Sequence, residues 1–246
     1  MSFLFPMTFC YNEYPRVLSG CFHLIQLLTR PLVSETRKYK PGRIREQNSL
    51  KILQAAEVEF VKHGYKGTSM QSISDAAGLP KANLHYYFTN KAKLYNAVLE
   101  DIVQRWNEVL ADITEDDDPT ETLEFYIRTK VELAIHYPNA SKIFATEIIQ
   151  GAPNVNEYLR TDLRTWLRAK TKIIETWIEQ GKMGKVDPQH LFFMIWSTTQ
   201  HYADFETQIL TITNKLEYEA DDIERISRFL CHMILTGCGL TPTHKL

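Results

Sequence analysis

The chain has 246 residues and a mass of 28.6 kDa, the size of one large domain or two modest ones. Hydrophobic residues make up 44% and charged residues 24%, which excludes wholesale disorder, and 10 Gly with 10 Pro exclude collagen-like or low-complexity architectures. The formal net charge of −2 conceals a strongly uneven distribution along the chain.

Charge separates the chain into a basic block and an acidic block. Residues 1–36 carry two Lys or Arg against two Asp or Glu, and residues 37–95 carry 11 against 4, a net charge of +7. Residues 96–246 carry 15 against 24, a net charge of −9. The two blocks therefore have different expected partners, and the basic one is a candidate for binding a polyanion. Chance segregation on a solvated surface is the alternative.

Residues 1–36 form a leader without a sustained helical or strand period, too apolar for an ordinary tail and too short for a domain. Either it forms an extra helix that packs on the rest, or the start codon is assigned too far upstream; we favour a natural start near Val33. Its apolar stretch Val17–Leu28 is too short for a membrane span and lacks the flanks of a secretory signal.

Four cysteines without a Cys-x-x-Cys pair fit a reducing compartment, so we expect a cytoplasmic protein.

From Ser49 onward the apolar residues recur at helical spacing, and no stretch alternates as strands do. Good N-cap residues precede several helices, and Gly64 and Gly78 are expected stops. The expected caps are Thr68, Asn90, Asp118, Asn139 and Asp187. The predicted helices cover residues 49–64, 69–77, 80–87, 91–113, 119–137, 139–151, 154–180, 191–210 and 220–236. The sequence thus predicts an all-α protein of nine helices, with a domain boundary near the middle of the fourth.

The second and third predicted helices have the proportions of a helix-turn-helix. Gly78 permits the positive φ that turns the third helix across the second. The groups left on the outer face of the third helix are donors, an amide and aromatic hydroxyls, which can bind base edges and phosphates in a major groove. They belong to Lys81, Ala82, Asn83, His85, Tyr86 and Tyr87.

Further groups near the two short helices are suited to phosphate. Thr68 at a helix N-terminus is expected to bind a phosphate through free backbone N–H groups, and Lys91 follows just beyond the third helix. An N-terminal basic arm is supplied by Arg37, Lys38, Lys40, Arg43, Arg45 and Lys51. These features predict DNA binding with a steep salt dependence. A helical hairpin with a solvated outer face is the alternative.

The gap-free run from Thr68 to Phe88, followed by Asn90-Lys91, resembles the DNA-binding signature of the TetR family of transcriptional regulators. The resemblance implies a three-helix DNA-binding domain, here residues 37–95, and a six-helix ligand-binding and dimerisation domain, here residues 96–246. It also implies release from operator DNA by a small molecule. The candidate DNA-binding residues are Thr68, Gln71, Pro80, Lys81, Asn83, His85, Tyr86, Tyr87 and Lys91.

The predicted eighth helix carries Trp196, Thr199, Gln200 and Ala203 on one face. An aromatic ring one turn from a carboxamide suits a flat, uncharged heterocycle, and the edge of uracil complements the amide. No Lys or Arg lies between Asp187 and Asn214, which argues against an anionic ligand bound by this helix. The alternative places the Trp and Gln in the core or in a dimer interface.

Several segments are also similar to the pyrimidine-utilisation regulators of the TetR family, over about residues 46–210. They are 187–205, 137–141, 151–153 and 181–182. This resemblance implies uracil or thymine as the effector, with Trp106 of the fourth helix reaching the site of Trp196 and Gln200. The leader has no counterpart and residues 220–246 are only weakly similar, so the details of the dimer interface do not carry over. The operator sequence does not carry over either, because Ala82 and His85 differ from the pattern of those regulators.

These observations together predict a homodimeric repressor of pyrimidine or nitrogen metabolism, with no cofactor and no enzymatic activity. Two recognition helices would enter successive major grooves of a palindromic operator, and uracil would favour a state in which they are wrongly spaced. The fourth helix, with Lys91 and Trp106 near its ends, is the expected switch. One alternative is a TetR-type repressor that senses an unrelated apolar or amphipathic compound. The other is a helical enzyme built on His201 and Asp204, a pair that lacks the third ligand a metal would need.

Overall fold

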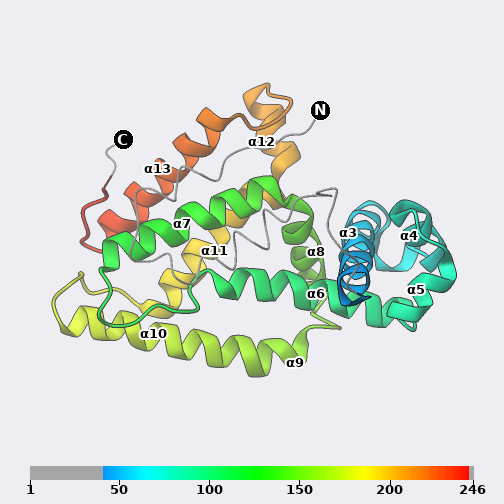
Figure 1. The fold of residues 1–246 in the computed structure, drawn as a ribbon. Coiled ribbons are helices and arrows are strands. Elements are labelled where there is room, and N and C mark those ends of the chain that lie inside the picture. Colours follow the sequence, from blue (N-terminus) through cyan, green and yellow to red (C-terminus); the bar gives the residue numbers. More distant parts are fainter. Residues whose placement is uncertain (1–40, 244–246) are drawn as a thin grey trace. The chain divides into compact units, whose positions relative to one another are not determined.

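The computed structural model describes residues 41–243, and these residues contain helices, turns and no strand (Figure 1). The predicted all-α class is confirmed. Chain contacts divide the described residues into two compact units, one of residues 41–104 and 139–157 and the other of residues 105–138 and 158–243. We call the first the head unit and the second the body unit. The leader 1–36 and the arm residues Arg37, Lys38 and Lys40 lie outside the described residues.

The head unit contains the three helices predicted for DNA binding, the start of a fourth, and one helix from later in the chain. They are α3 (Pro41–Gly67), α4 (Met70–Ala77), α5 (Lys81–Tyr87), α6 (Lys91–Glu108) and α8 (Pro138–Ile149). Helix α3 begins well before Ser49, at Pro41, and a proline is tolerated in the first turn of a helix. The prediction placed the start later because the apolar stripe begins only near Ser49. The expected stop at Gly64 is a kink inside α3, with φ 66° and ψ 172°.

The core of the head unit follows the predicted apolar stripe. Ile52 and Ala56 of α3 are fully buried, and so are Ile73 of α4 and Leu84 of α5. Gly78 adopts the left-handed conformation, with φ 63°, and its backbone N–H closes the end of α4. The predicted glycine turn between the two short helices is confirmed.

A buried carboxylate ties α8 into the head unit. Glu147 is 2% exposed, and its Oε2 accepts hydrogen bonds from the Tyr95 hydroxyl and from Asn154 Nδ2, each at 3.1 Å. The backbone N–H of Asn154 donates to Glu147 Oε1 at 2.5 Å. Tyr95 also packs edge-on against Phe60, with ring centroids 4.8 Å apart. The segment that follows residue 138 is therefore joined to α3 and α6 by polar and aromatic contacts.

The body unit is built around α7, whose side chains are buried over most of its length and which packs against α11 and α13. Its elements are α7 (Pro119–His136), the π-helical η1 (Leu159–Leu163), α10 (Arg164–Glu179), α11 (Pro188–Asp204), α12 (Glu206–Thr213) and α13 (Ala220–Gly237), with α9 (Asn156–Tyr158) directly before η1. The expected caps Asp118 and Asp187 are confirmed, since each accepts a backbone N–H three residues on.

The nine predicted helices have counterparts in the structure, and besides the longer first helix several of their bounds differ from the prediction. The fourth ends at Glu108 rather than Ile113, because buried Val109 and Leu110 continue the apolar pattern through a turn. Asn139 is not a cap, since α8 already begins at Pro138. The seventh comprises α9, η1 and α10, and the eighth breaks at Phe205 (φ −114°, ψ 25°) into α11 and α12.

Candidate DNA-binding and effector sites

The exposed face of α5 carries the residues expected to read DNA. Lys81, Asn83 and His85 are exposed, and Tyr86 is 72% exposed, although Leu84 between them is fully buried. Pro80 caps the N-terminal end of the helix and is exposed as well. A helix that buries one apolar side and presents these donors on the other can bring them to the base edges in a major groove.

Aromatic contacts hold the end of this face. The rings of Tyr86 and Tyr87 meet edge to face, with centroids 5.3 Å apart. The Arg45 guanidinium lies 5.9 Å from the centroid of the Tyr86 ring, and Asn48 Nδ2 donates to the Tyr87 hydroxyl at 3.4 Å. Asn48 is a residue that sequence reasoning missed. Tyr87 is half-buried, so its hydroxyl is oriented by α3 while Tyr86 remains free to contact a ligand.

The sequence predicts Thr68 as the N-cap of α4, and this prediction is wrong. The cap is Ser69, which has extended backbone (φ −119°, ψ 155°) and whose hydroxyl accepts the Ser72 backbone N–H at 3.0 Å. Thr68 is 2% exposed, and its hydroxyl is directed at the carbonyls of Glu59 (3.0 Å) and Gly64 (2.8 Å). The buried Thr68 side chain thus closes the end of α3, and the free N–H groups of α4 follow Ser69.

Lys91, expected to contact a phosphate, is directed into the head unit. Its Nζ donates to the carbonyls of Tyr65 (2.7 Å) and Thr68 (2.8 Å), with a longer contact of 3.5 Å to Lys66. The same ammonium lies 4.7 Å from the centroid of the Tyr65 ring. A cation at the C-terminal end of a helix is stabilised by the helix dipole and by the unpaired carbonyls there. Lys91 therefore joins the first turn of α6 to the end of α3.

Gln71 is exposed on α4, but its amide is already engaged. Its Nε2 donates to Asp75 Oδ1 at 2.8 Å, with a weaker contact of 3.4 Å to Ser74 Oγ. A DNA contact from Gln71 would use the carbonyl oxygen of the amide or exchange the Asp75 bond.

Asn90 accepts the backbone N–H of Lys93 at 2.9 Å, which confirms the expected cap of α6.

The second candidate site, in the body unit, is the face of α11 around Trp196. The indole Nε1 donates to the hydroxyl of Tyr126 on α7 at 2.7 Å, so sequence reasoning missed Tyr126 as the partner of the Trp. Trp196 also packs against Trp166, Phe192 and Phe193, with ring centroids 5.7–6.1 Å away. The Trp196 ring is half-buried. One part of it packs in the core of the body unit, as the alternative interpretation of this residue predicts.

The other residues of this face of α11 differ in whether their polar groups are free to bind a ligand. Thr199 and Ala203 are fully buried, and the Thr199 hydroxyl donates to the Ile195 carbonyl at 2.7 Å. Gln200 is half-buried, and its carboxamide makes no hydrogen bond to any other described residue. Among these residues, Gln200 holds the amide that remains free for a ligand.

Trp106 of α6 meets a buried lysine. Lys130 of α7 is 4% exposed, and its Nζ lies 4.3 Å from the centroid of the Trp106 ring. Burial lowers the pKa of Lys130 to about 7, and nearby Asp204 of α11 acts in the opposite direction. A cation over an indole face is an attractive interaction, worth more when desolvated. The sequence gives no indication that Lys130 is buried, because a lysine in a helix is most often at the surface.

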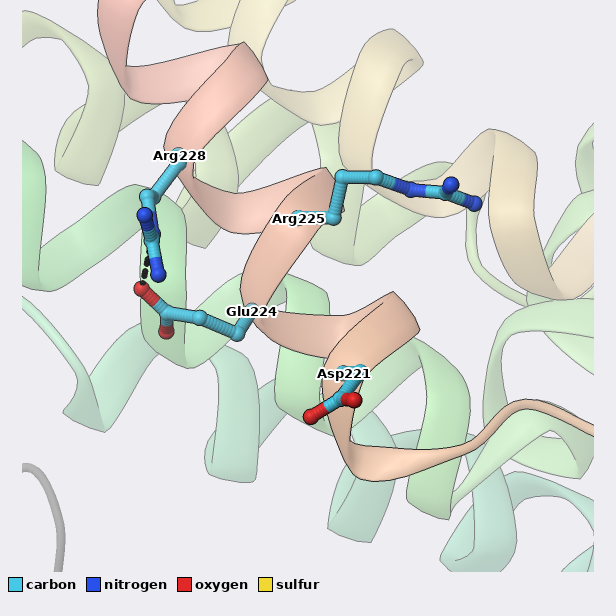
Figure 2. A pocket seen from close by; sticks show the side chains of 4 residues that line it. All are labelled: Asp221, Glu224, Arg225 and Arg228. Atoms are coloured by element: carbon cyan, nitrogen blue, oxygen red, sulfur yellow. Dashed lines mark hydrogen bonds and ion pairs between the residues drawn. The ribbon is translucent and has the colours of Figure 1, made fainter. Parts of the chain in front are cut away.

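The hollow on the N-terminal half of α13 has a volume of 240 Å³ and none of the predicted site residues (Figure 2). Its lining residues are Asp221, Glu224, Arg225 and Arg228. Two acidic and two basic side chains balance one another there, and Arg228 Nε donates to Glu224 Oε1 at 2.7 Å, as Figure 2 shows. The chemistry of this surface does not suit a neutral heterocycle.

His201 and Asp204, the pair considered for an enzyme or a metal, do not form a recognisable centre. The His201 ring stacks on Phe205 with centroids 4.8 Å apart. Within residues 41–243, no group of three or more His, Cys, Asp or Glu side chains is placed to hold a metal ion. Over the same residues, no helix combines the length and the apolar character needed to cross a membrane.

Two short helices that cross at Gly78 and expose a polar, basic face define a helix-turn-helix DNA-binding protein. Residues 52–98 match the family described as "Bacterial regulatory proteins, tetR family", and residues 99–241 match "YcdC-like protein, C-terminal region". The chain belongs to the TetR family of transcription regulators.

Within that family the chain is similar to the HTH-type transcriptional regulator RutR of Escherichia coli (strain K12), with 43% identity over 162 residues, 66% of this chain and 76% of that protein. Two solved structures share the fold. AibR in complex with isovaleryl coenzyme A and operator DNA has a TM-score of 0.60 at 20% identity, covering 76% of this chain and 98% of that one. FadR from Bacillus subtilis in complex with stearoyl-CoA has a TM-score of 0.57 at 18% identity, with the same coverage.

Proposed function

We propose that the chain is a cytoplasmic homodimeric repressor of pyrimidine or nitrogen metabolism that leaves its operator when uracil or thymine binds. The observation that carries the effector is the free carboxamide of Gln200, one helical turn from the Trp196 indole. A pyrimidine edge presents adjacent N–H and C=O groups, which a carboxamide complements, and its ring can stack on an indole. The resemblance of residues 187–205 and the other segments named above to pyrimidine-utilisation regulators favours the same assignment.

On the DNA side, we propose contacts from the exposed face of α5 and the start of α4. This face comprises Pro80, Lys81, Asn83, His85, Tyr86 and Tyr87, with Gln71 beside it, while Thr68 and Lys91 hold the geometry of the helix ends. Each recognition helix reads one half-site, so operator binding requires two copies of the chain.

The dimer face that we propose lies on α11 and α13, which pack against each other in the body unit. Phe193 and Met194 of α11 are 41% and 43% exposed, and Phe229 and Met233 of α13 are 48% and 57% exposed. Large apolar side chains gathered on two neighbouring helices are typical of an interface, and a second copy of the same face covers them in a two-fold dimer.

We propose α6 as the element that connects the two events, because one unbroken helix carries Lys91 in its first turn and Trp106 in its last. An effector that binds near Trp106 and favours one position of α6 would alter how the recognition helices are held. By thermodynamic linkage, operator DNA must then weaken effector binding by the same factor by which the effector weakens DNA binding.

For Tyr86→Ala, we expect operator affinity to fall by about 1–3 kcal/mol for each half-site, because an exposed aromatic hydroxyl of the recognition helix is lost. A mobility-shift titration with the operator measures the loss, and calorimetry with uracil should show unchanged effector binding. Tyr86→Phe keeps the ring and removes only the hydroxyl, so it should show the same loss if the hydroxyl alone makes the contact and a smaller loss if the ring contributes. Wild-type affinity in the Ala variant would exclude Tyr86 from the interface.

For Gln200→Ala, we expect operator binding to persist and the uracil concentration for half-release to rise about 10-fold to 100-fold, through loss of hydrogen bonds to the ring edge. A mobility shift titrated with uracil, thymine and cytosine provides the measurement. Gln208→Ala, an exposed glutamine of α12, is the control. Release of the Gln200→Ala variant at the wild-type uracil concentration would refute the effector site.

A further inference from the structure

Lys130 is a buried lysine whose amine makes no hydrogen bond to the part of the chain that the structure describes. It is 4% exposed, and none of its three ammonium protons is donated to another described residue, although the Trp106 ring lies 4.3 Å from Nζ. An ammonium that is largely withdrawn from water and has no protein acceptor is disfavoured, which is why burial lowers the pKa of Lys130. An apolar side chain of similar length would satisfy the packing alone, so the retained amine points to a missing acceptor.

The register of α7 against α11 places that amine beside the proposed effector site. Tyr126 and Lys130 lie one turn apart on α7, and Trp196, Gln200 and Asp204 lie one turn apart on α11. Trp196 bonds to Tyr126, and Asp204 is close enough to Lys130 to influence its pKa. Gln200, between Trp196 and Asp204, therefore faces the stretch of α7 that ends at Lys130.

We propose that Lys130 donates a hydrogen bond to a carbonyl oxygen of the effector and selects for cyclic imides and related rings that carry carbonyl acceptors at their edge. The inference rests on the proposed function, since it concerns the same effector site. Gln200 would then bind one edge of the ring and Lys130 a carbonyl at another. A heterocycle that presents only donors at that position leaves the ammonium without an acceptor and is rejected.

This arrangement makes effector binding dependent on pH. Burial lowers the pKa of free Lys130 to about 7, whereas a bound carbonyl favours the charged form and raises that pKa. The affinity for uracil is then at its maximum below about pH 7 and decreases as the pH rises through the pKa of Lys130 in the bound state. Of the groups facing Lys130, Asp204 of α11 raises the pKa of the amine, Tyr126 of α7 stays protonated because burial raises its pKa, and α6 presents the uncharged Trp106.

The test is calorimetry of uracil binding to the full chain between about pH 6 and about pH 8.5, for wild type and Lys130→Met. Wild-type affinity should decrease above about pH 7 by up to about 10-fold per pH unit. Lys130→Met should bind uracil about 10-fold to 100-fold more weakly at about pH 6 and show no pH dependence. Met retains the length and volume of the stem, and Lys172→Met, an exposed lysine of α10, is the matched control.

A second variant protects the test against a folding defect. Asp204→Asn removes the negative charge that favours protonated Lys130, so the decrease in uracil affinity should begin at a lower pH than in wild type. An unchanged pH profile in Asp204→Asn, or equal uracil affinity in wild type and Lys130→Met, overturns the role of Lys130 and leaves the proposed function standing. Absence of uracil and thymine binding by wild type at every pH overturns the proposed effector and this inference together.

Discussion

Replacing Lys91 with Met is expected to weaken operator binding without changing how steeply that binding depends on salt. In the structure the Lys91 ammonium donates to the carbonyls of Tyr65 and Thr68 and lies over the Tyr65 ring. These bonds hold α6 to the end of α3, next to the start of α4. Their loss should lower the stability of the head unit by about 1–3 kcal/mol, since hydrogen bonds to charged groups contribute amounts of this size.

Two roles of Lys91 give different results in one experiment. A lysine that contacts a phosphate contributes about one unit to the slope of log affinity against log salt concentration, so its removal makes the slope shallower. A lysine that only holds helix ends leaves the slope unchanged, and its removal lowers the thermal midpoint of unfolding instead. We expect the second pattern for Lys91→Met, measured by mobility shift at several salt concentrations and by calorimetric melting. Lys93→Met, an exposed neighbour on α6, is the control.

A shallower slope with an unchanged melting temperature would contradict this expectation and return Lys91 to the phosphate-contacting role predicted from the sequence. An unchanged affinity, slope and melting temperature would show that the three carbonyls are satisfied as well by water. Both outcomes are distinguishable from misfolding, because a misfolded head unit loses its helical circular dichroism as well as its affinity.

Replacing Phe229 with Glu is expected to convert the proposed dimer into a monomer. Phe229 is 48% exposed on α13, one turn before Met233, and α13 packs against α11, which carries the exposed Phe193 and Met194. In a two-fold interface the substitution enters twice, and each carboxylate loses water against an apolar face. Operator affinity should then fall at least about 100-fold, because one recognition helix reads only one half-site.

Light scattering after gel filtration measures the mass of the Phe229→Glu variant, and a mobility shift measures its affinity. Ile149→Glu is the matched control, since Ile149 is 84% exposed on α8 and outside the proposed face. A dimeric Phe229→Glu variant with wild-type operator affinity would place the interface elsewhere on the chain. The same variant should bind uracil normally, because Phe229 lies on α13 and the proposed effector residues lie on α6, α7 and α11.

The parts of the fold that depend on neighbouring residues were predictable from the sequence. Asp118 and Asp187, each followed by proline, cap their helices as expected, and Gly78 turns α5 across α4. Which of two adjacent hydroxyl residues caps α4 was not predictable in this way. Thr68 is directed at the end of α3 by contacts that exist only in the folded chain, and Ser69 takes the cap.

The proposed effector site shows the same division. Trp196 and Gln200 could be identified because their spacing places them on one helical face, and their shared face is independent of the rest of the fold. Tyr126 and Lys130 could not, because they lie on α7, a helix buried over most of its length, where the pattern gives no information about which side faces α11. The break at Phe205 was equally hidden, since no glycine or proline marks it.

The buried Glu147 carboxylate has a consequence for engineering. Sensor chimeras are made by joining the DNA-reading helices of one regulator to the ligand-responsive part of another. A cut directly after α6 would leave the Tyr95 hydroxyl without its acceptor and remove α8 from the unit to which it belongs. A transplantable reading module of this protein would therefore be discontinuous, composed of residues 41–104 together with residues 139–157.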